Sequence, residues 1–182
     1  MGDLGVIVNP KAIQKNRLLN KLICLDSVDS TNKYLSRNNC ASGTVVVSAI
    51  QTGGMGKHGA DWSSPKGGLW FSYIIRRKIK RPYDFVILSS VAVCEAMEAL
   101  GLKPEIKWPN DILLGGRKVS GILIENDHYN GRIITGIGIN VNNRVPAGIK
   151  AVSMASALGR KADIGAFFLF VLKKMDRYMC RL

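Results

Sequence analysis

Two short apolar runs around a pair of glycines constrain the fold of this chain more than any other feature. Residues 112–114 and 122–124 have the length and composition of β-strands, and Gly115 and Gly116 lie between them. Glycine adopts the positive φ angles that a tight two-residue turn between antiparallel strands requires. The sequence therefore predicts a β-hairpin, with Lys118 early on its second strand.

Polar residues precede this hairpin. Pro109 has no backbone donor and ends a strand, which leaves Asn110 and Asp111 at the strand's tip. With Lys118 they would bring an amide, a carboxylate and an ammonium group together, a set that suits chemistry on an anionic substrate. Two structural alternatives remain: Lys118 is a surface cation whose stem covers apolar atoms, and Asn110 or Asp111 forms an Asx turn.

A glycine-rich segment lies upstream, between predicted core strands at residues 44–50 and 69–75. Its six glycines and its length do not suit a tight hairpin turn, so we expect it to close over a ligand. Glycine lets backbone N–H groups approach phosphate oxygens, and Lys57 and His58 add positive charge. The segment is not a P-loop, because it lacks the Gly-Lys-Ser/Thr ending and a following helix. A disordered surface loop is the structural alternative.

Six blocks of sequence have a recognisable order and spacing: residues 29–32, 51–62, 64–69, 107–111, 118–125 and 136–142. Together they resemble the catalytic domain of biotin protein ligases, and the resemblance runs from about residue 22 to residue 143. The resemblance implies an α+β fold, in which helices pack on a mixed, mainly antiparallel sheet.

The resemblance also implies a two-step reaction. Biotin and ATP, both substrates, would form biotinyl-5′-AMP, and biotin would then pass to a lysine of a biotin carboxyl carrier protein. Lys118 is implied as the catalytic residue, because it matches the lysine that reaches the biotin carboxylate and the α-phosphate. Mg²⁺ is expected with the nucleotide, since carboxylate and triphosphate repel each other. No protein ligand set for a metal is expected.

The implied site residues come from several segments. For biotin they are Ser30, Thr31, Asn32, Gln51, Gly54, Met55, Lys57, Trp62 and Gly121; for the nucleotide and its phosphates they are Lys57, Asn110, Asp111, Lys118, Asn140 and Asn142. Residues 142–154 are expected to order over the nucleotide. Two alternatives stay open: Trp62 is a core aromatic, and Ser30 is the N-cap of a helix over residues 30–39.

The glycine-rich segment departs from the family pattern. Relatives usually carry Gly-Arg-Gly-Arg-x-Gly-Arg, whereas this chain has Met55, Lys57 and Ala60 at the three arginine positions. Lysine keeps a charge but lacks the planar fork that holds a phosphate at two points. We therefore expect a weaker hold on the adenylate and some release of it. A low-activity or ligand-sensing protein is the alternative.

The length of 182 residues suits one domain. We expect an N-terminal extension over residues 1–20 and a catalytic domain over residues 21–182, with no winged-helix domain before it and no small β-barrel after it. Helices are predicted over residues 84–100 and 163–181, and the aromatic side chains of the second helix, Phe170 among them, are expected to pack on the sheet. Residues 119–125 are expected to pair with 133–139 through a polar turn. A homodimer through sheet edges is compatible with the resemblance.

The chain is strongly basic, with 26 Lys and Arg against 13 Asp and Glu and a formal net charge of +13. Such charge attracts nucleic acid or an acidic carrier protein. No helix-turn-helix, zinc-finger or aromatic RNA-binding signature accompanies it, so specific DNA binding is not expected. The densest basic run, residues 76–81, is most simply a solvated loop.

Localisation and the competing functions complete the expectations. The four cysteines have no Cys-x-x-Cys spacing, which favours a reducing, cytoplasmic compartment. No apolar segment is long enough to span a membrane, and no signal peptide is evident. The alternatives are a lipoate or octanoate acyltransferase of the same superfamily, and a basic biotin-binding or nucleic-acid-binding module of little or no activity. Residues 107–111 favour the biotin ligase.

Overall fold

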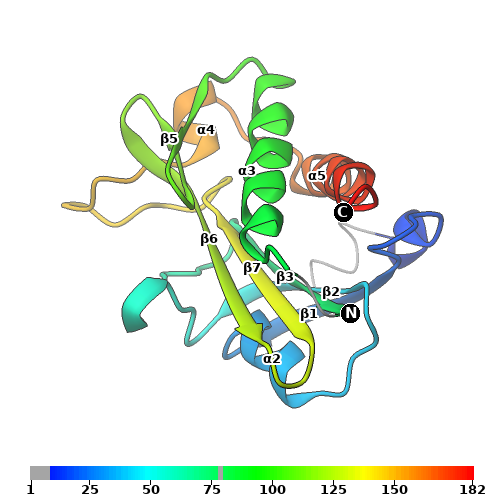
Figure 1. Ribbon diagram of the computed structural model, residues 1–182. Coiled ribbons are helices and arrows are strands. Elements are labelled where there is room, and N and C mark those ends of the chain that lie inside the picture. Colours follow the sequence, from blue (N-terminus) through cyan, green and yellow to red (C-terminus); the bar gives the residue numbers. More distant parts are fainter. Residues whose placement is uncertain (1–8, 78–79) are drawn as a thin grey trace.

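A single mixed sheet organises the chain (Figure 1). The computed structural model describes residues 9–77 and 80–182, and within them the sheet has seven strands in the order β1-β2-β3-β7-β6-β5-β4. The strands are β1 (Lys21–Val28), β2 (Thr44–Gln51), β3 (Leu69–Arg76), β4 (Pro104–Lys107), β5 (Asp111–Leu114), β6 (Arg117–Asp127) and β7 (Arg132–Ile139). β1 and β2 are parallel, and the other neighbouring pairs are antiparallel. The predicted α+β class is confirmed.

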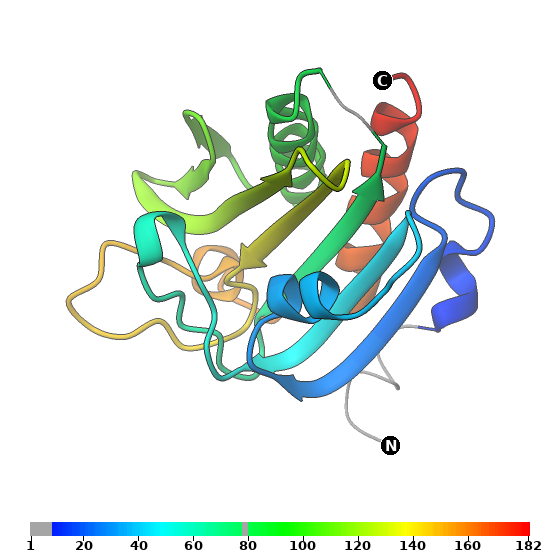
Figure 2. The same ribbon diagram turned by 60° about the horizontal axis from the view of Figure 1, so that its bottom comes forward.

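Helices cover both faces of this sheet. They are η1 (Pro10–Ile13), α2 (Thr31–Arg37), η2 (Lys57–Gly59), α3 (Tyr83–Glu98), α4 (Met154–Leu158) and α5 (Ile164–Met179). Figure 2 shows α2 in front of the sheet, with α3 and α5 behind it. Because side chains alternate along a strand, Ile134 packs with Leu35 of α2, whereas Ile133 and Ile137 join the larger core on the α3 and α5 side.

The predicted hairpins are confirmed. Gly115 and Gly116 join β5 to β6 with φ angles of 55° and 69°, the sign that a tight turn between antiparallel strands needs. β6 pairs with β7 from Ser120 to Asp127, and both strands run further toward the turn than predicted. β4 ends at Lys107, before a cis Trp108–Pro109 peptide bond, so Asn110 and Asp111 follow the strand break as expected.

The predicted helices are present with adjusted ends. Ser30 is the N-cap of α2, although its side chain makes no capping hydrogen bond, and the helix is shorter than residues 30–39. On α5, Phe167 and Phe168 are buried in the core, but Phe170, which was expected to pack on the sheet, is 39% exposed. Phe170 lies on the outer side of the helix, and the sequence argument placed it wrongly.

Part of the predicted N-terminal extension belongs to the core. Ile13 and Leu19 are buried among the residues that pack under α3 and α5. The carboxylate of Asp176, on α5, accepts hydrogen bonds from the backbone N–H groups of Arg17, Leu18 and Leu19 at 2.9, 2.7 and 2.9 Å. The segment before β1 is therefore fastened to the last helix.

Two of the predicted segments lie only partly within the described residues. Lys78 and Ile79 of the basic run, and the first eight residues of the predicted extension, lie outside the described residues. Within ranges 9–77 and 80–182, no helix is both long and apolar enough to cross a lipid bilayer.

Asp176→Ala should lower the free energy of unfolding by about 3 kcal/mol, because it leaves one buried and two partly buried N–H donors without their acceptor. Urea denaturation followed by circular dichroism measures this loss. Asp163→Ala is the matched control: Asp163 accepts one exposed hydrogen bond, from Ala166 N–H at 3.0 Å, and its loss should cost about 1 kcal/mol. Equal losses in the two variants would contradict the anchoring role of Asp176.

Candidate functional site

The first cavity, of about 250 Å³, lies on the α2 face of the sheet, between α2, the glycine-rich segment and the strands β5 to β7. Its lining comprises Ser30, Thr31, Asn32, Gln51, Met55, Gly56, Lys57, Ala60, Asp61, Trp62, Phe71, Asn110, Asp111, Lys118, Gly121, Ile122, Leu123, Gly136, Ile137 and Gly138. One end is polar, and the middle is formed by glycines and apolar side chains.

The polar end is held by hydrogen bonds at the start of α2. Gln51 Oε1 accepts from the backbone N–H and the hydroxyl of Thr31 at 2.9 and 3.0 Å, and Gln51 Nε2 donates to Ser64 Oγ at 2.8 Å. Asn32 Nδ2 donates to Glu125 Oε1 at 2.7 Å, and its Oδ1 accepts from Ser72 at 2.6 Å. These bonds orient the amide and hydroxyl groups before any ligand arrives.

Trp62 lies against a patch of sheet without side chains. Gly121 of β6 and Gly138 of β7 are directly paired, so they lie on the same face. A Cβ at Gly138 would lie 2.4 Å from Trp62 Nε1, and a Cβ at Gly121 would lie 3.0 Å from the same ring. Gly136 makes similar room for Asn32 Oδ1, which would be 2.3 Å from a Cβ there. Because these positions are glycines, the Trp62 indole and the Asn32 side-chain amide can pack directly on the sheet.

Lys118 reaches the cavity because of a β-bulge. In strict alternation, residues three apart on a strand point to opposite faces, which would turn Lys118 away from Gly121. However, Ile112 pairs with Ser120 while Leu113 pairs with Lys118, so Val119 is an extra residue in β6. The bulge returns Lys118 to the face of Gly121.

On that face, the Lys118 ammonium group has two contacts. Its Nζ lies 2.8 Å from Asp111 Oδ1 and 5.0 Å from the centroid of the Trp62 ring. The second distance is within the range of a cation–π interaction. Lys118 is therefore positioned by a carboxylate and an aromatic face, while its side chain remains partly exposed to the cavity.

A second cavity, of about 230 Å³, adjoins the first. Its lining comprises Asp61, Trp62, Ser63, Lys118, Asn140, Asn143, Val145, Pro146, Ile149, Lys150 and Ala151. Asp61, Trp62 and Lys118 line both cavities. The outer wall is tied to the lysine, because Lys118 N–H donates to Lys150 O at 3.1 Å and Val152 N–H donates to Lys118 O at 2.9 Å.

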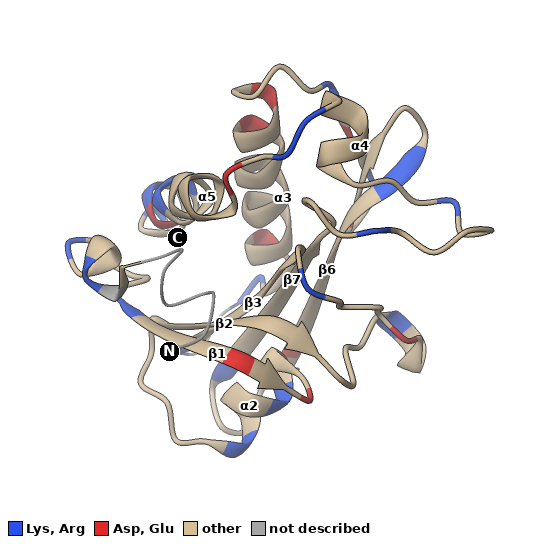
Figure 3. Ribbon diagram, turned by 180° about the vertical axis from the view of Figure 1, so that it is seen from behind, with Lys and Arg blue, Asp and Glu red and all other residues tan. Residues whose placement is uncertain are grey.

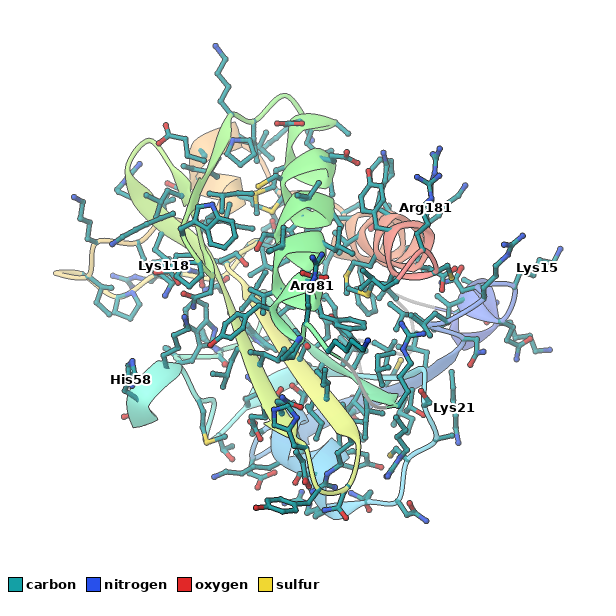
Figure 4. All side chains as sticks on the ribbon, viewed as in Figure 1. Lys15, Lys21, His58, Arg81, Lys118 and Arg181 are labelled. Atoms are coloured by element: carbon teal, nitrogen blue, oxygen red, sulfur yellow. The ribbon has the colours of Figure 1, made fainter. Side chains whose placement is uncertain are left out.

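The glycine-rich segment has its own backbone pairing, which does not fit the alternative of a disordered loop. Gly56 N–H donates to Ala60 O at 2.6 Å, and Trp62 N–H donates to Gly54 O at 2.9 Å. Lys57 lines the first cavity. His58, with a φ of 56°, lies outside the lining of both cavities, and Figure 4 shows it at the outer end of the loop.

Most residues expected at the site are brought together. All of the expected biotin residues except Gly54 line the first cavity, and Asn140 lines the second beside Lys118. Gly54 is not in the lining of either cavity, and a Cβ there would lie 2.4 Å from Trp62 O. Asn142 lines neither cavity, because its amide donates to Ala162 O and accepts from Ala162 N–H, both at 2.9 Å.

Among the lining residues that the sequence argument did not name are two polar residues and one glycine. Asn143 lines the second cavity, where Asn142 had been expected, and Asp61 lines both cavities. The Trp62 ring packs on Gly138. Only Gly138 gave a signal in the sequence, since Gly136 and Gly138 alternate on one face of a strand, where glycine indicates a close approach by another group.

The fold and the two joined cavities define a domain that can hold two small ligands end to end, with one lysine between them. Residues 24–143 match the model of the Biotin/lipoate A/B protein ligase family. The "Bifunctional ligase/repressor BirA" of Bacillus subtilis is 41% identical over 151 residues, which are 76% of this chain and 46% of that protein. The "Biotin--[acetyl-CoA-carboxylase] ligase" of Paracoccus denitrificans is 30% identical, over 87% of this chain and 72% of that protein.

Solved structures agree with these matches. The biotin protein ligase from Aquifex aeolicus, in complex with biotin and ATP, superposes with a TM-score of 0.82 and 34% identity, over 88% of this chain and 70% of that one. The chain belongs to the biotin/lipoate A/B protein ligase family. It spans about half the length of the BirA proteins that it matches.

Gly138→Ala should push the Trp62 indole off the sheet, because the added Cβ has no room beside Nε1. In a Trp108→Phe background, which removes the most exposed tryptophan, the emission should shift to longer wavelength and acrylamide quenching should increase. Gly53→Ala is the control, since a Cβ there meets only Asp29 O at 3.5 Å. Unchanged emission and quenching in Gly138→Ala would contradict the packing of Trp62.

Proposed function

We propose that this chain is the catalytic part of a biotin protein ligase. In this proposal it activates biotin with ATP and transfers biotin to a lysine of a biotin carboxyl carrier protein. The observation that carries it is the position of Lys118 in the wall common to two cavities. The likeness to a solved ligase that holds biotin and ATP supports the assignment of one cavity to each substrate.

In the first half-reaction, a carboxylate oxygen of biotin attacks the α-phosphorus of ATP. A new oxygen–phosphorus bond forms, the bond from the α-phosphorus to the bridging oxygen breaks, and pyrophosphate leaves. Negative charge accumulates on the α-phosphate where the cavities meet. In this proposal Lys118 Nζ stabilises that charge, and a fixed cation in a partly enclosed site does so with little reorganisation.

In the second half-reaction, the neutral amine of the carrier lysine attacks the carbonyl carbon of biotinyl-5′-AMP. The amide bond forms, the bond from that carbon to the phosphate oxygen breaks, AMP leaves, and the amine gives up a proton. The Thr31, Gln51 and Asn32 network would hold the polar ring of biotin by its N–H and C=O groups. Trp62 would separate the mixed anhydride from water.

Mg²⁺ enters this proposal as part of the substrate Mg-ATP. In nucleotide sites Mg²⁺ is commonly held by one or two carboxylates together with the phosphates. Asp111 and Asp61 fit that chemistry, since Asp111 lies beside Lys118 and Asp61 lines both cavities. When bound, the ion would reduce the repulsion between carboxylate and triphosphate.

The partner and the compartment are also part of the proposal. An acidic carrier domain would be attracted by the net charge of +13. All four cysteines are free, which supports a reducing cytoplasmic compartment. Homodimerisation stays a prediction that size measurement in solution would test.

Biotin-dependent exchange of labelled pyrophosphate into ATP tests the function directly. The proposal expects exchange with biotin and Mg-ATP, and no exchange with lipoate or octanoate in place of biotin. Exchange that depends on lipoate or octanoate would assign the other branch of the family. No exchange with any of these acids would contradict an acyl-adenylating enzyme.

Lys118→Ala should reduce the exchange rate about 100- to 1,000-fold, the range observed when one transition-state contact is removed. The fold should persist, because the lysine contributes little packing. Arg117→Ala is the matched control: its side chain is the exposed neighbour on the same strand and lines neither cavity. A Lys118→Ala enzyme with full activity would remove Lys118 from the mechanism.

Lys57→Arg should slow the dissociation of biotinyl-5′-AMP several-fold, because a guanidinium holds a phosphate at two points and an ammonium group at one. Release of the labelled intermediate from the isolated complex measures this rate. Lys33→Arg, on the exposed side of α2, controls for the exchange of charge type. Equal dissociation rates in wild type and Lys57→Arg would contradict the expectation that this loop binds biotinyl-5′-AMP weakly.

A further inference from the structure

A basic groove of about 620 Å³ lies on the other side of the molecule, between the segment that follows η1 and the second half of α5. Its lining comprises Lys15, Asn16, Arg17, Phe170, Lys173, Lys174, Asp176, Arg177, Cys180 and Arg181. We name this surface the α5 groove. Figure 3 shows basic segments along α5, seen from behind.

The carboxylate that lines this groove does not neutralise it. Asp176 is 8% exposed, and both of its oxygens accept backbone N–H groups from residues 17–19. Its charge is turned toward the protein interior, where it fixes the wall of the groove. The carboxylate therefore shapes the groove without pairing with its cations.

One cation of the groove is already paired. Lys174 Nζ lies 2.7 Å from Glu95 Oε2. The hydrogen bond from Lys174, with a second from the Tyr178 hydroxyl, holds the pKa of Glu95 below its usual range. Lys174 therefore links α5 to α3 through its ion pair with Glu95.

Five cations remain, and they are exposed. In the part of the chain that the structure describes, they make no ion pair with a carboxylate. They are Lys15, Arg17, Lys173, Arg177 and Arg181. Five like charges around one trough repel each other, and an anionic occupant would relieve that repulsion.

The spacing of these cations suits a linear polyanion. Lys173 and Arg177 are four residues apart on α5, so they lie on one side of the helix about 6 Å apart, and Arg181 follows four residues later, just past the helix end. Lys15 and Arg17 face the same trough from the other wall. Three of the five are arginines, whose planar guanidinium groups bind phosphate oxygens at two points.

An exposed aromatic ring lies in the same groove. Phe170 is 39% exposed, and Lys174 Nζ lies over its ring, 5.4 Å from the centroid. A cationic trough with an aromatic ring is the arrangement with which proteins hold single-stranded nucleic acid, by phosphate contacts and base stacking. An unpaired base can stack on this ring, whereas an acidic peptide needs no such contact.

The position of the groove argues against a carrier protein as its occupant. Lys15 and Arg181 lie on the opposite side of the molecule from Lys118 in Figure 4, and α5 covers the sheet face opposite to α2. A carrier must present its lysine to the cavity beside Lys118. A protein held in the α5 groove would not do so.

From this geometry we propose that the α5 groove binds the phosphate backbone of single-stranded nucleic acid, without reading its sequence. This binding is separate from the proposed ligase activity and needs no domain of the helix-turn-helix type. RNA and DNA share the recognising chemistry, so the experiment compares both.

Fluorescence anisotropy of labelled oligothymidine DNA and oligouridine RNA tests the proposal on the 182-residue chain. We expect saturable binding that weakens steeply between about 50 and about 200 mM salt. Lys173→Gln, Arg177→Gln and Arg181→Gln combined should weaken binding at least about tenfold. The slope of log K against log salt should fall by about 2, since each contact to a single strand contributes about 0.7.

The control removes the same charge elsewhere. Lys103→Gln, Arg160→Gln and Lys161→Gln combined change exposed cations outside the groove, and binding should stay within about twofold of wild type. Urea denaturation of both triple variants checks that they fold equally well. The oligonucleotide that binds with the higher affinity shows whether the groove prefers DNA or RNA.

Three results would overturn the proposal. No binding at low salt would show that the groove holds no polyanion. Equal weakening by the two triple variants would show that the net charge alone attracts the strand. Competition by polyglutamate of equal length, as strong as that by unlabelled oligonucleotide, would assign the groove to acidic proteins instead.

Discussion

The site depends on the bulge in β6, where Val119 is the residue without a partner in β5. Backbone alternation is a rigid constraint, and one residue more or less moves every following side chain to the other face. With the bulge, Lys118 joins Gly121, Trp62 and Asp111 on the α2 face of the sheet, while Val119 stays in the core. The backbone of Lys118 also pairs with residues 150 and 152, and Lys150 and Ala151 of that segment line the second cavity.

Glycine provides the complementary constraint. The neighbouring glycines of β6 and β7 leave a bare patch of sheet, and Trp62 lies on it. The indole then forms a wall of both cavities and a face for the Lys118 ammonium group. The glycines of β6 and β7 and the bulge in β6 together create a place where two ligands can meet at one cation. The proposed chemistry, which joins an acid to a phosphate, needs that meeting point.

Much of this was predictable from the sequence, because local signals agreed with the tertiary structure. The glycine pair at residues 115 and 116 predicted the hairpin, and Pro109 predicted the strand break before Asp111. The bulge was not predictable in this way, since it depends on the register between β5 and β6 and leaves no mark in composition. Asn142 and Asn143 could not be told apart, because which amide faces the cavity depends on the return of the chain at Ala162.

The central claim is that the first cavity takes biotin and that the nucleotide lies beside it, across Lys118. Calorimetric titration of biotin into the chain, alone and in the presence of a non-hydrolysable ATP analogue with Mg²⁺, tests that claim most directly. The account predicts saturable one-to-one binding of biotin that the analogue alters, since both ligands contact the same lysine. The absence of any heat of biotin binding in both titrations would contradict it.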